Sequence, residues 1–227
     1  MWHSYFYQLQ KKYSMRVSKK EPLVIRLDGK NATKTRNNDF INNYPGSFIN
    51  SIEKCAEYFT KKYKCYAMFG SDEISFIFPN PAKVINDLDK EHDDHSNEIS
   101  TLFAQYFFDY FNGIYKVEKI FWHAKCFSIP EGKISSYIKF RSSVISNVLT
   151  TFFLIKNNMY HGGNDSVEKR LAKCEKSPNF FALENIVNGI LYYNGNRINL
   201  EEFHNGKTIV LDTLNYEETP TIDLLDF

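Results

Sequence analysis

The strongest constraint on the fold is the order in which strand-like and helix-like patterns follow one another over the first 130 residues. Short branched or alternating apolar runs predict strands, and apolar side chains repeated at helical spacing predict amphipathic helices. In chain order the patterns are a strand at 22–28, a helix at 47–63, strands at 65–69 and 74–78, a second helix that begins near 99, and a strand at 119–129.

This order is β-α-β-β-α-β, and it predicts an α+β fold of the ferredoxin-like type. Such a fold has an antiparallel sheet with both helices on one face. A polar and acidic loop is expected from 86 to 97, between the hairpin and the second helix.

The chain after Pro130 changes character and is predicted to be mostly helical. We expect 1–130 to form the core and 131–227 to form an extension of additional C-terminal helices packed on it, within the same domain. The predicted features of the extension are helices at 134–155, 167–174 and 180–188, turns at 162–163 and 194–195, and a strand at 207–211.

Composition places the chain among ordinary globular proteins. No apolar run reaches the roughly 18–20 residues that cross a bilayer, and the N-terminus lacks a signal-peptide pattern, so we expect a cytoplasmic protein with no membrane partner. The four cysteines form no C-x-x-C pair, which argues against a zinc ribbon and favours free thiols. A net charge of +1 neither requires nor excludes a nucleic-acid partner.

Two aspartates carry the chemical argument. Asp28 precedes Gly29 where the first strand is expected to end, and Ser71, Asp72 and Glu73 occupy the predicted hairpin turn. Because the first and third strands are neighbours in this topology, Asp28 and Asp72 can lie side by side. Close carboxylates repel unless a hard cation joins them. Each aspartate alone would be ordinary turn chemistry, but together they favour a two-magnesium site for phosphoryl displacement.

The tract at 28–31, Asp-Gly-Lys-Asn, also favours a phosphate ligand. Backbone N–H groups that the turn leaves unpaired could cradle a triphosphate. Lys30 and Lys34 either add positive charge there or are solvated surface lysines.

Three runs resemble the signatures of the tRNA-His guanylyltransferase family, including its guanylyltransferase-like members. They are Arg-Leu-Asp-Gly-Lys-Asn at 26–31, Gly-Ser-Asp-Glu-Ile-Ser-Phe at 70–76 and Asn-Gly-Ile-Leu-Tyr-Tyr-Asn at 188–194. The resemblance implies a polymerase-type palm and a magnesium-dependent addition of nucleotides, GTP preferred, to the 5′ end of tRNA in the 3′-to-5′ direction. It also implies activation of that end with ATP or GTP, and a homo-oligomer, either tetramer or dimer.

The resemblance further implies a role for each matching residue. The carboxylates of Asp28 and Asp72 and the backbone carbonyl of Gly29 would hold two magnesium ions, with Glu73 as the acidic partner in the catalytic set. The nucleotide-binding set would be Gly29, Lys30, Asn31, Ala32, Thr33 and Ser71.

The chain departs from the family pattern around the phosphates. On the long helix Arg141 matches the family's arginine, Ser146 stands at the histidine position, and Asn147 matches only with a one-residue deletion. On the fourth strand, Asp-Ala-Arg becomes His-Ala-Lys at 123–125, and His123 is either a phosphate donor or a satisfied strand histidine. For Arg141 a phosphate contact and a surface ion pair are equally expected. The candidate phosphate or RNA contacts are Lys125, Lys139, Arg141 and Asn147.

These departures favour repair of truncated tRNA 5′ ends over strict specificity for tRNA-His. Two alternatives use the same palm. A nucleotidyl cyclase or cyclic-oligonucleotide synthase would need the carboxylates and no tRNA. A palm that binds nucleotide or RNA without reacting would explain the altered phosphate shell.

Overall fold

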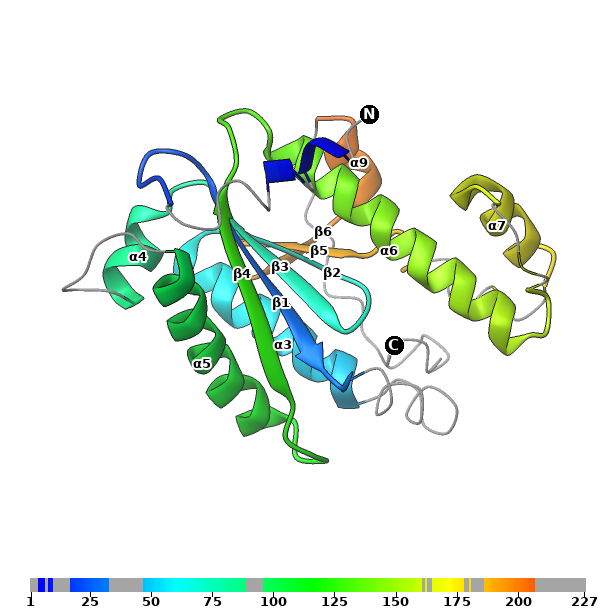
Figure 1. Ribbon diagram of the computed structural model, residues 1–227, viewed down its shortest axis with the longest axis horizontal. Helices are drawn as coiled ribbons and strands as arrows, with labels where there is room; N and C mark the ends of the chain where they lie inside the picture. The colour runs from blue at the N-terminus through cyan, green and yellow to red at the C-terminus, as the bar shows by residue number, and fades with distance from the viewer. Residues whose placement is uncertain are drawn as a thin grey trace.

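The computed structural model describes residues 4–6, 8–9, 17–32, 47–88, 96–160, 162, 165–177, 180 and 186–206. Within them, one antiparallel sheet has the strand order β4-β1-β3-β2-β5-β6 (Figure 1). The strands are β1 (Leu23–Lys30), β2 (Tyr66–Phe69), β3 (Glu73–Phe78), β4 (Phe121–Ser128), β5 (Ile190–Tyr193) and β6 (Asn196–Ile198).

Helices lie on both sides of this sheet, and some of them pack on another helix rather than on the sheet (Figure 1). They are α3 (Ser47–Tyr63), α4 (Ala82–Leu88), α5 (Ser96–Ile114), α6 (Ile134–Lys156), α7 (Val167–Cys174) and α9 (Leu200–His204). The predicted α+β class with an antiparallel sheet is therefore confirmed.

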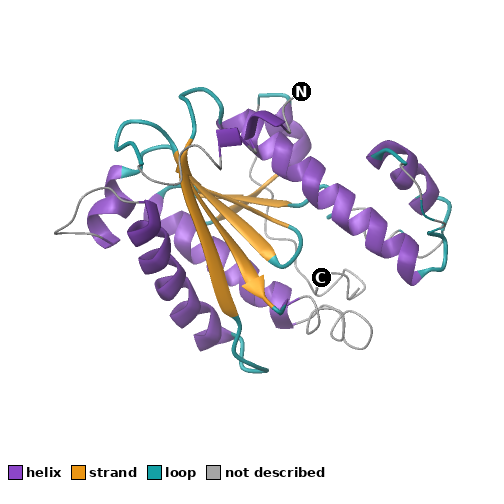
Figure 2. Cartoon of the chain, viewed as in Figure 1, coloured by secondary structure: helices purple, strands orange, loops and turns teal. Residues whose placement is uncertain are grey.

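Helices α3 and α5 lie on one face of the sheet (Figure 2). Aromatic rings form the core between these helices and the sheet. The ring of Phe76 on β3 lies 5.5 Å from that of Phe59 on α3, and 5.3 and 5.8 Å from those of Phe103 and Phe107 on α5. Both helices lie on one side of the sheet, as the sequence predicts.

Helix α6 lies on the opposite face. Successive side chains of a strand point to opposite sides, so Ser75 faces away from its neighbour Phe76, and the Ser75 and Tyr137 hydroxyls lie 3.4 Å apart. By length and composition alone α6 could cross a membrane, which corrects the expectation that no segment reaches that length. Of its most apolar 18-residue window 56% is buried, as in the core helix of a soluble protein.

The predicted elements of the first 130 residues are present, with two corrections. Strand β1 does not stop at Asp28, because Gly29 and Lys30 continue to pair with Trp122 and Phe121 on β4. Part of the predicted loop at 86–97 is helical, since α4 extends to Leu88.

The C-terminal half holds strands that the sequence prediction missed. Strand β5 pairs with β2, and β6 with β5, so two strands extend the sheet rather than helices alone. Asn194 and Gly195 form the predicted turn between them, with φ values of 51° and 83°, as a two-residue hairpin turn of type I′ requires. Residues 186–188 form a turn rather than the end of a helix. The predicted strand at 207–211 lies outside the described residues.

Candidate active site

The hairpin turn meets the end of β1 through a backbone hydrogen bond. The N–H of Gly29 donates to the carbonyl oxygen of Asp72 over 2.8 Å. One residue earlier, Asp28 is the register partner of Glu73, the first residue of β3. The structure therefore brings the end of β1, which bears Asp28, beside the turn that bears Asp72.

Asp28 lies in a row of polar side chains on the sheet face opposite α3 and α5. Directly opposed residues in antiparallel strands share a face, so Asp28 lies beside Glu73 on one neighbour and beside His123 on the other. Two residues back, Arg26 is opposed to Lys125 in the same way. Asp28, His123 and Lys125 are solvent-exposed, so this part of the face is open.

Glu73 is held by two arginines. Its carboxylate lies 3.8 Å from Arg26 Nε and forms a close ion pair with Arg141 of α6. The Arg141 side chain is only 2% exposed and that of Glu73 14% exposed. Arg141 is thus placed in a buried ion pair, which corrects the expectation of a surface ion pair, whereas its contact with a phosphate stays a prediction.

Gly29 is required by close approach of the backbone. A Cβ at this position would lie 2.8 Å from the Ala32 Cβ and 3.4 Å from the Asp72 carbonyl oxygen. The chain then turns at Asn31, whose φ is 62°, and buries Ala32 completely. Thr33 and Lys34 of the predicted cradle lie outside the described residues.

Helix α6 packs directly against the hairpin turn. Ser71 is 4% exposed. A Cβ on the preceding Gly70 would meet the Ile145 Cγ2 of α6 at 2.4 Å, and one on Gly189 would meet the Ile145 Cδ1 at 2.9 Å. Small residues on both sides therefore let α6 approach the turn that carries Asp72.

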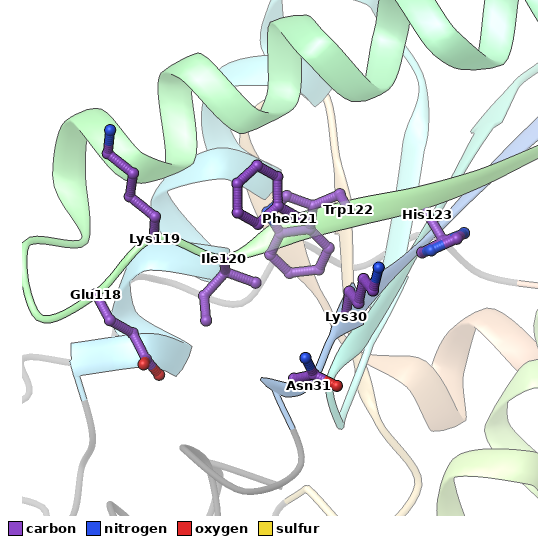
Figure 3. A pocket seen from close by; sticks show the side chains of 8 residues that line it. All are labelled: Lys30, Asn31, Glu118, Lys119, Ile120, Phe121, Trp122 and His123. Carbon is purple, nitrogen blue, oxygen red and sulfur yellow. The ribbon is translucent and has the colours of Figure 1, made fainter.

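A cleft of about 640 Å³ opens beside the end of β1 (Figure 3). This volume is within the range of sites for small ligands and cofactors. It is formed by the last residues of β1, the first residues of β4 and the segment before β4. The lining residues are Lys30, Asn31, Glu118, Lys119, Ile120, Phe121, Trp122 and His123. Sequence reasoning missed the segment at 118–122, where the adjacent Phe and Trp were a usable signal.

Two other predicted contacts lie elsewhere. Asn147 is exposed on α6, and its side-chain oxygen accepts a hydrogen bond from Arg170 of α7. Lys139 is exposed near α9. The pKa of His204 on that helix is lowered, mainly by burial of the imidazole and to a smaller extent by the positive charge of Lys139. Neither Asn147 nor Lys139 is among the residues that line the cleft.

The side-chain oxygens that could bind a metal at this site are those of Asp28 and Asp72. Among the described residues, no group of three or more His, Cys, Asp or Glu side chains is arranged around a common metal position. Magnesium in nucleotide enzymes commonly takes one or two carboxylates together with substrate phosphates and water. Asp28 at the end of β1 and Asp72 in the adjoining turn are the two carboxylates that would serve such a site.

Three solved structures share this fold. A bacterial tRNA(His) guanylyltransferase-like protein in complex with ATP has a TM-score of 0.60 at 14% identity over 84% of this chain and 83% of that one. The GTP complex of a protein of the same description gives 0.57 at 14% over the same shares. The tRNA(His) guanylyltransferase of Saccharomyces cerevisiae gives 0.55 at 16%, over 94% and 100%.

At these identities the likeness establishes the fold alone. The family assignment comes from the sequence: the family model described as tRNAHis guanylyltransferase matches residues 4–147, more than half of the 227. The chain therefore belongs to the tRNAHis guanylyltransferase family and is a nucleotidyltransferase. No curated protein sequence matches it.

Proposed function

We propose that this chain adds nucleotides, GTP preferred, to the 5′ end of a tRNA in the 3′-to-5′ direction, with magnesium and after activation by ATP or GTP. The observation that carries the proposal is the 2.8 Å hydrogen bond from the Gly29 N–H to the Asp72 carbonyl. It joins the end of the strand that bears Asp28 to the turn that bears Asp72. Membership of the family supplies the reaction class.

The sheet is best described as a polymerase-type palm of ferredoxin-like topology. The order β4-β1-β3-β2, with α3 and α5 on one face, supports this description. The opposite face is open where β1 ends, so a nucleotide and an RNA end have room to meet there.

The residues at the end of β1 fit two magnesium ions. The Asp28 and Asp72 carboxylates and the Gly29 carbonyl are hard oxygen donors. Bound there, such ions would neutralise phosphate charge and activate the attacking 3′-hydroxyl. The backbone of 29–33 and the Ser71 hydroxyl would orient the triphosphate, with Lys30 adding charge.

Glu73 is better suited to orienting than to proton transfer. Its carboxylate faces two guanidinium groups, Arg26 and Arg141, which favour the charged form. We therefore assign Glu73 to holding the first residue of β3, and with it the Asp72 turn, in register with Asp28.

Repair of shortened tRNA 5′ ends is the preferred substrate assignment. Ser146, at the family's histidine position, is 4% exposed, so this position offers no side chain to an RNA surface. A cytoplasmic homo-oligomer, dimer or tetramer, completes the proposal, and the exposed Ile155 and Tyr160 near the end of α6 give apolar surface for such contacts. Light scattering after size-exclusion chromatography measures the oligomer.

The test incubates the protein with 5′-truncated tRNAs, labelled GTP and magnesium. We expect templated 5′ extension by the wild type and at least a hundredfold slower extension by Asp72→Asn. The control is Asp109→Asn, an exposed aspartate on α5, which should keep the wild-type rate. Failure to extend any tRNA would refute the proposal, and a cyclic product from nucleotides alone would indicate a cyclase instead.

A further inference from the structure

The proposed reaction brings two nucleotides to the same pair of aspartates. One is the incoming triphosphate, which the proposal places on the backbone at 29–33 and on Ser71. The other is the nucleotide at the RNA 5′ end, and no residue assigned so far would hold its base. A second nucleotide subsite is therefore needed within reach of Asp28.

The cleft at the start of β4 lies within reach of Asp28. Asp28 is paired with His123, and two residues further along the strands Lys30 is paired with Phe121. Two residues of an antiparallel strand span about 7 Å. His123, Lys30 and Phe121 all line the cleft, so it extends from the Asp28 pair toward the start of β4 (Figure 3).

Phe121 gives the cleft an aromatic platform. Its side chain is 59% exposed, a large value for a phenylalanine. The ring is nevertheless positioned, because it stacks on Phe108 of α5 with centroids 5.2 Å apart and planes 27° apart. A supported ring with most of its surface open can stack a nucleobase of any identity, which is how aromatic residues bind unpaired nucleotides.

The charges around this platform suit a nucleotide. Lys119 contributes a positive charge, Glu118 a negative charge, and His123 a further polar group beside Asp28. Lys30, which the proposed function assigns to the incoming triphosphate, lines the same cleft. The Lys119 ammonium can meet a phosphate, while the Glu118 carboxylate can accept hydrogen bonds from amino groups of a base. The cleft thus offers a stacking surface and a phosphate partner at one site.

We infer that this cleft is a second nucleotide subsite, in which the base of an unpaired nucleotide stacks on Phe121 and its phosphate points along β1 toward Asp28. The inference rests on the proposed function for the identity of its ligand. The ligand class is a nucleotide, whether at an RNA 5′ end or free as the activating nucleotide. The binding measurement below needs no turnover.

The test uses the full chain and a short 5′-phosphorylated RNA whose first base is 2-aminopurine. Stacking quenches this base, so titration gives a dissociation constant. We expect Phe121→Ala to weaken binding about 5- to 100-fold with loss of quenching, the range for one stacked base, and Phe121→Trp to retain it. The control is Leu102→Ala on α5, since Leu102 is 38% exposed but does not line the cleft.

Competition identifies the source of the nucleotide. Displacement of the RNA by ATP at similar concentration would assign the subsite to the activating nucleotide, whereas ATP without effect would assign it to the RNA end. Equal affinity and equal quenching for wild type and Phe121→Ala, with RNA and with ATP, would overturn the inference. Phe121-dependent binding without any 5′ extension would instead refute the proposed function and leave the subsite standing.

Discussion

The Gly29 N–H donates a 2.8 Å hydrogen bond to the Asp72 carbonyl oxygen, and a side chain on Gly29 would collide with Ala32, whose Cβ would lie 2.8 Å from the added Cβ. This bond fixes the hairpin turn against the end of β1. The position of the Asp72 carboxylate relative to Asp28 therefore depends on a residue that has no side chain of its own.

Replacing Gly29 by alanine should damage the site more than the fold. The added Cβ would lie 2.8 Å from the Ala32 Cβ, so the turn after β1 must shift. Overpacking of this kind costs about 1–3 kcal/mol, and we expect nucleotide addition to fall at least tenfold in kcat/KM. The matched control is Gly113→Ala on α5, where no atom lies within 4 Å and alanine should stabilise the helix by about 0.5–1 kcal/mol. Wild-type activity in Gly29→Ala would contradict the role given to this contact.

Removing Arg141 should destabilise the protein strongly. The Glu73 carboxylate would lose its buried partner, and breaking such a pair from one side costs about 3–5 kcal/mol. Urea unfolding of Arg141→Ala measures the loss. The half-exposed pair of Lys62 and Asp87, 3.5 Å apart, is the comparison, because Asp87→Asn should cost no more than about 1 kcal/mol. Equal effects of the two variants would show that the Arg141 pair is not a buried one.

The contact between Gly70 and Ile145 should show energetic coupling. Gly70→Ala would place a Cβ 2.4 Å from the Ile145 Cγ2, whereas Ile145→Ala removes that methyl group and leaves a cavity worth about 2–5 kcal/mol. In a double-mutant cycle the double variant should therefore be more stable than the sum of the single losses predicts. Simple additivity would mean that α6 is not held against the hairpin turn by this pair.

Alkaline pH should weaken the attachment of α6 through Tyr137. Burial raises the pKa of Tyr137 to about 12, whereas tyrosine in an unfolded chain titrates near about 10. Between these values the unfolded chain has lost the proton and the folded chain keeps it, so stability falls as pH rises from about 10 to 12. Urea midpoints at about pH 9, 10 and 11 should fall less steeply for Tyr137→Phe than for wild type. Tyr160→Phe, at a 40% exposed position, should follow the wild-type curve.

Local patterns were sufficient for the four strands and the helices α3 and α5 of the first 130 residues, although they missed α4. The apolar spacing of 47–63 predicts α3 within its observed bounds, because one face of that helix buries Phe48, Ile52 and Phe59. The C-terminal strands were missed because β5 and β6 span only four and three residues. Runs so short carry no clear period, and only pairing with β2 makes them part of the sheet.

In the candidate site too, some features follow from local sequence patterns and others only from tertiary packing. The sequence by itself determined the strand and hairpin that bear Asp28 and Asp72, because alternation and turn residues act over a few positions. It could not determine that Arg141 lies buried against Glu73, or that Phe121 supports one wall of a cleft beside Lys30. Those relationships join residues 68 and 91 positions apart, and only the packing of α6 and the β1–β4 register bring them together. Such contacts follow from the burial of whole helix and sheet faces, which no short window of sequence contains.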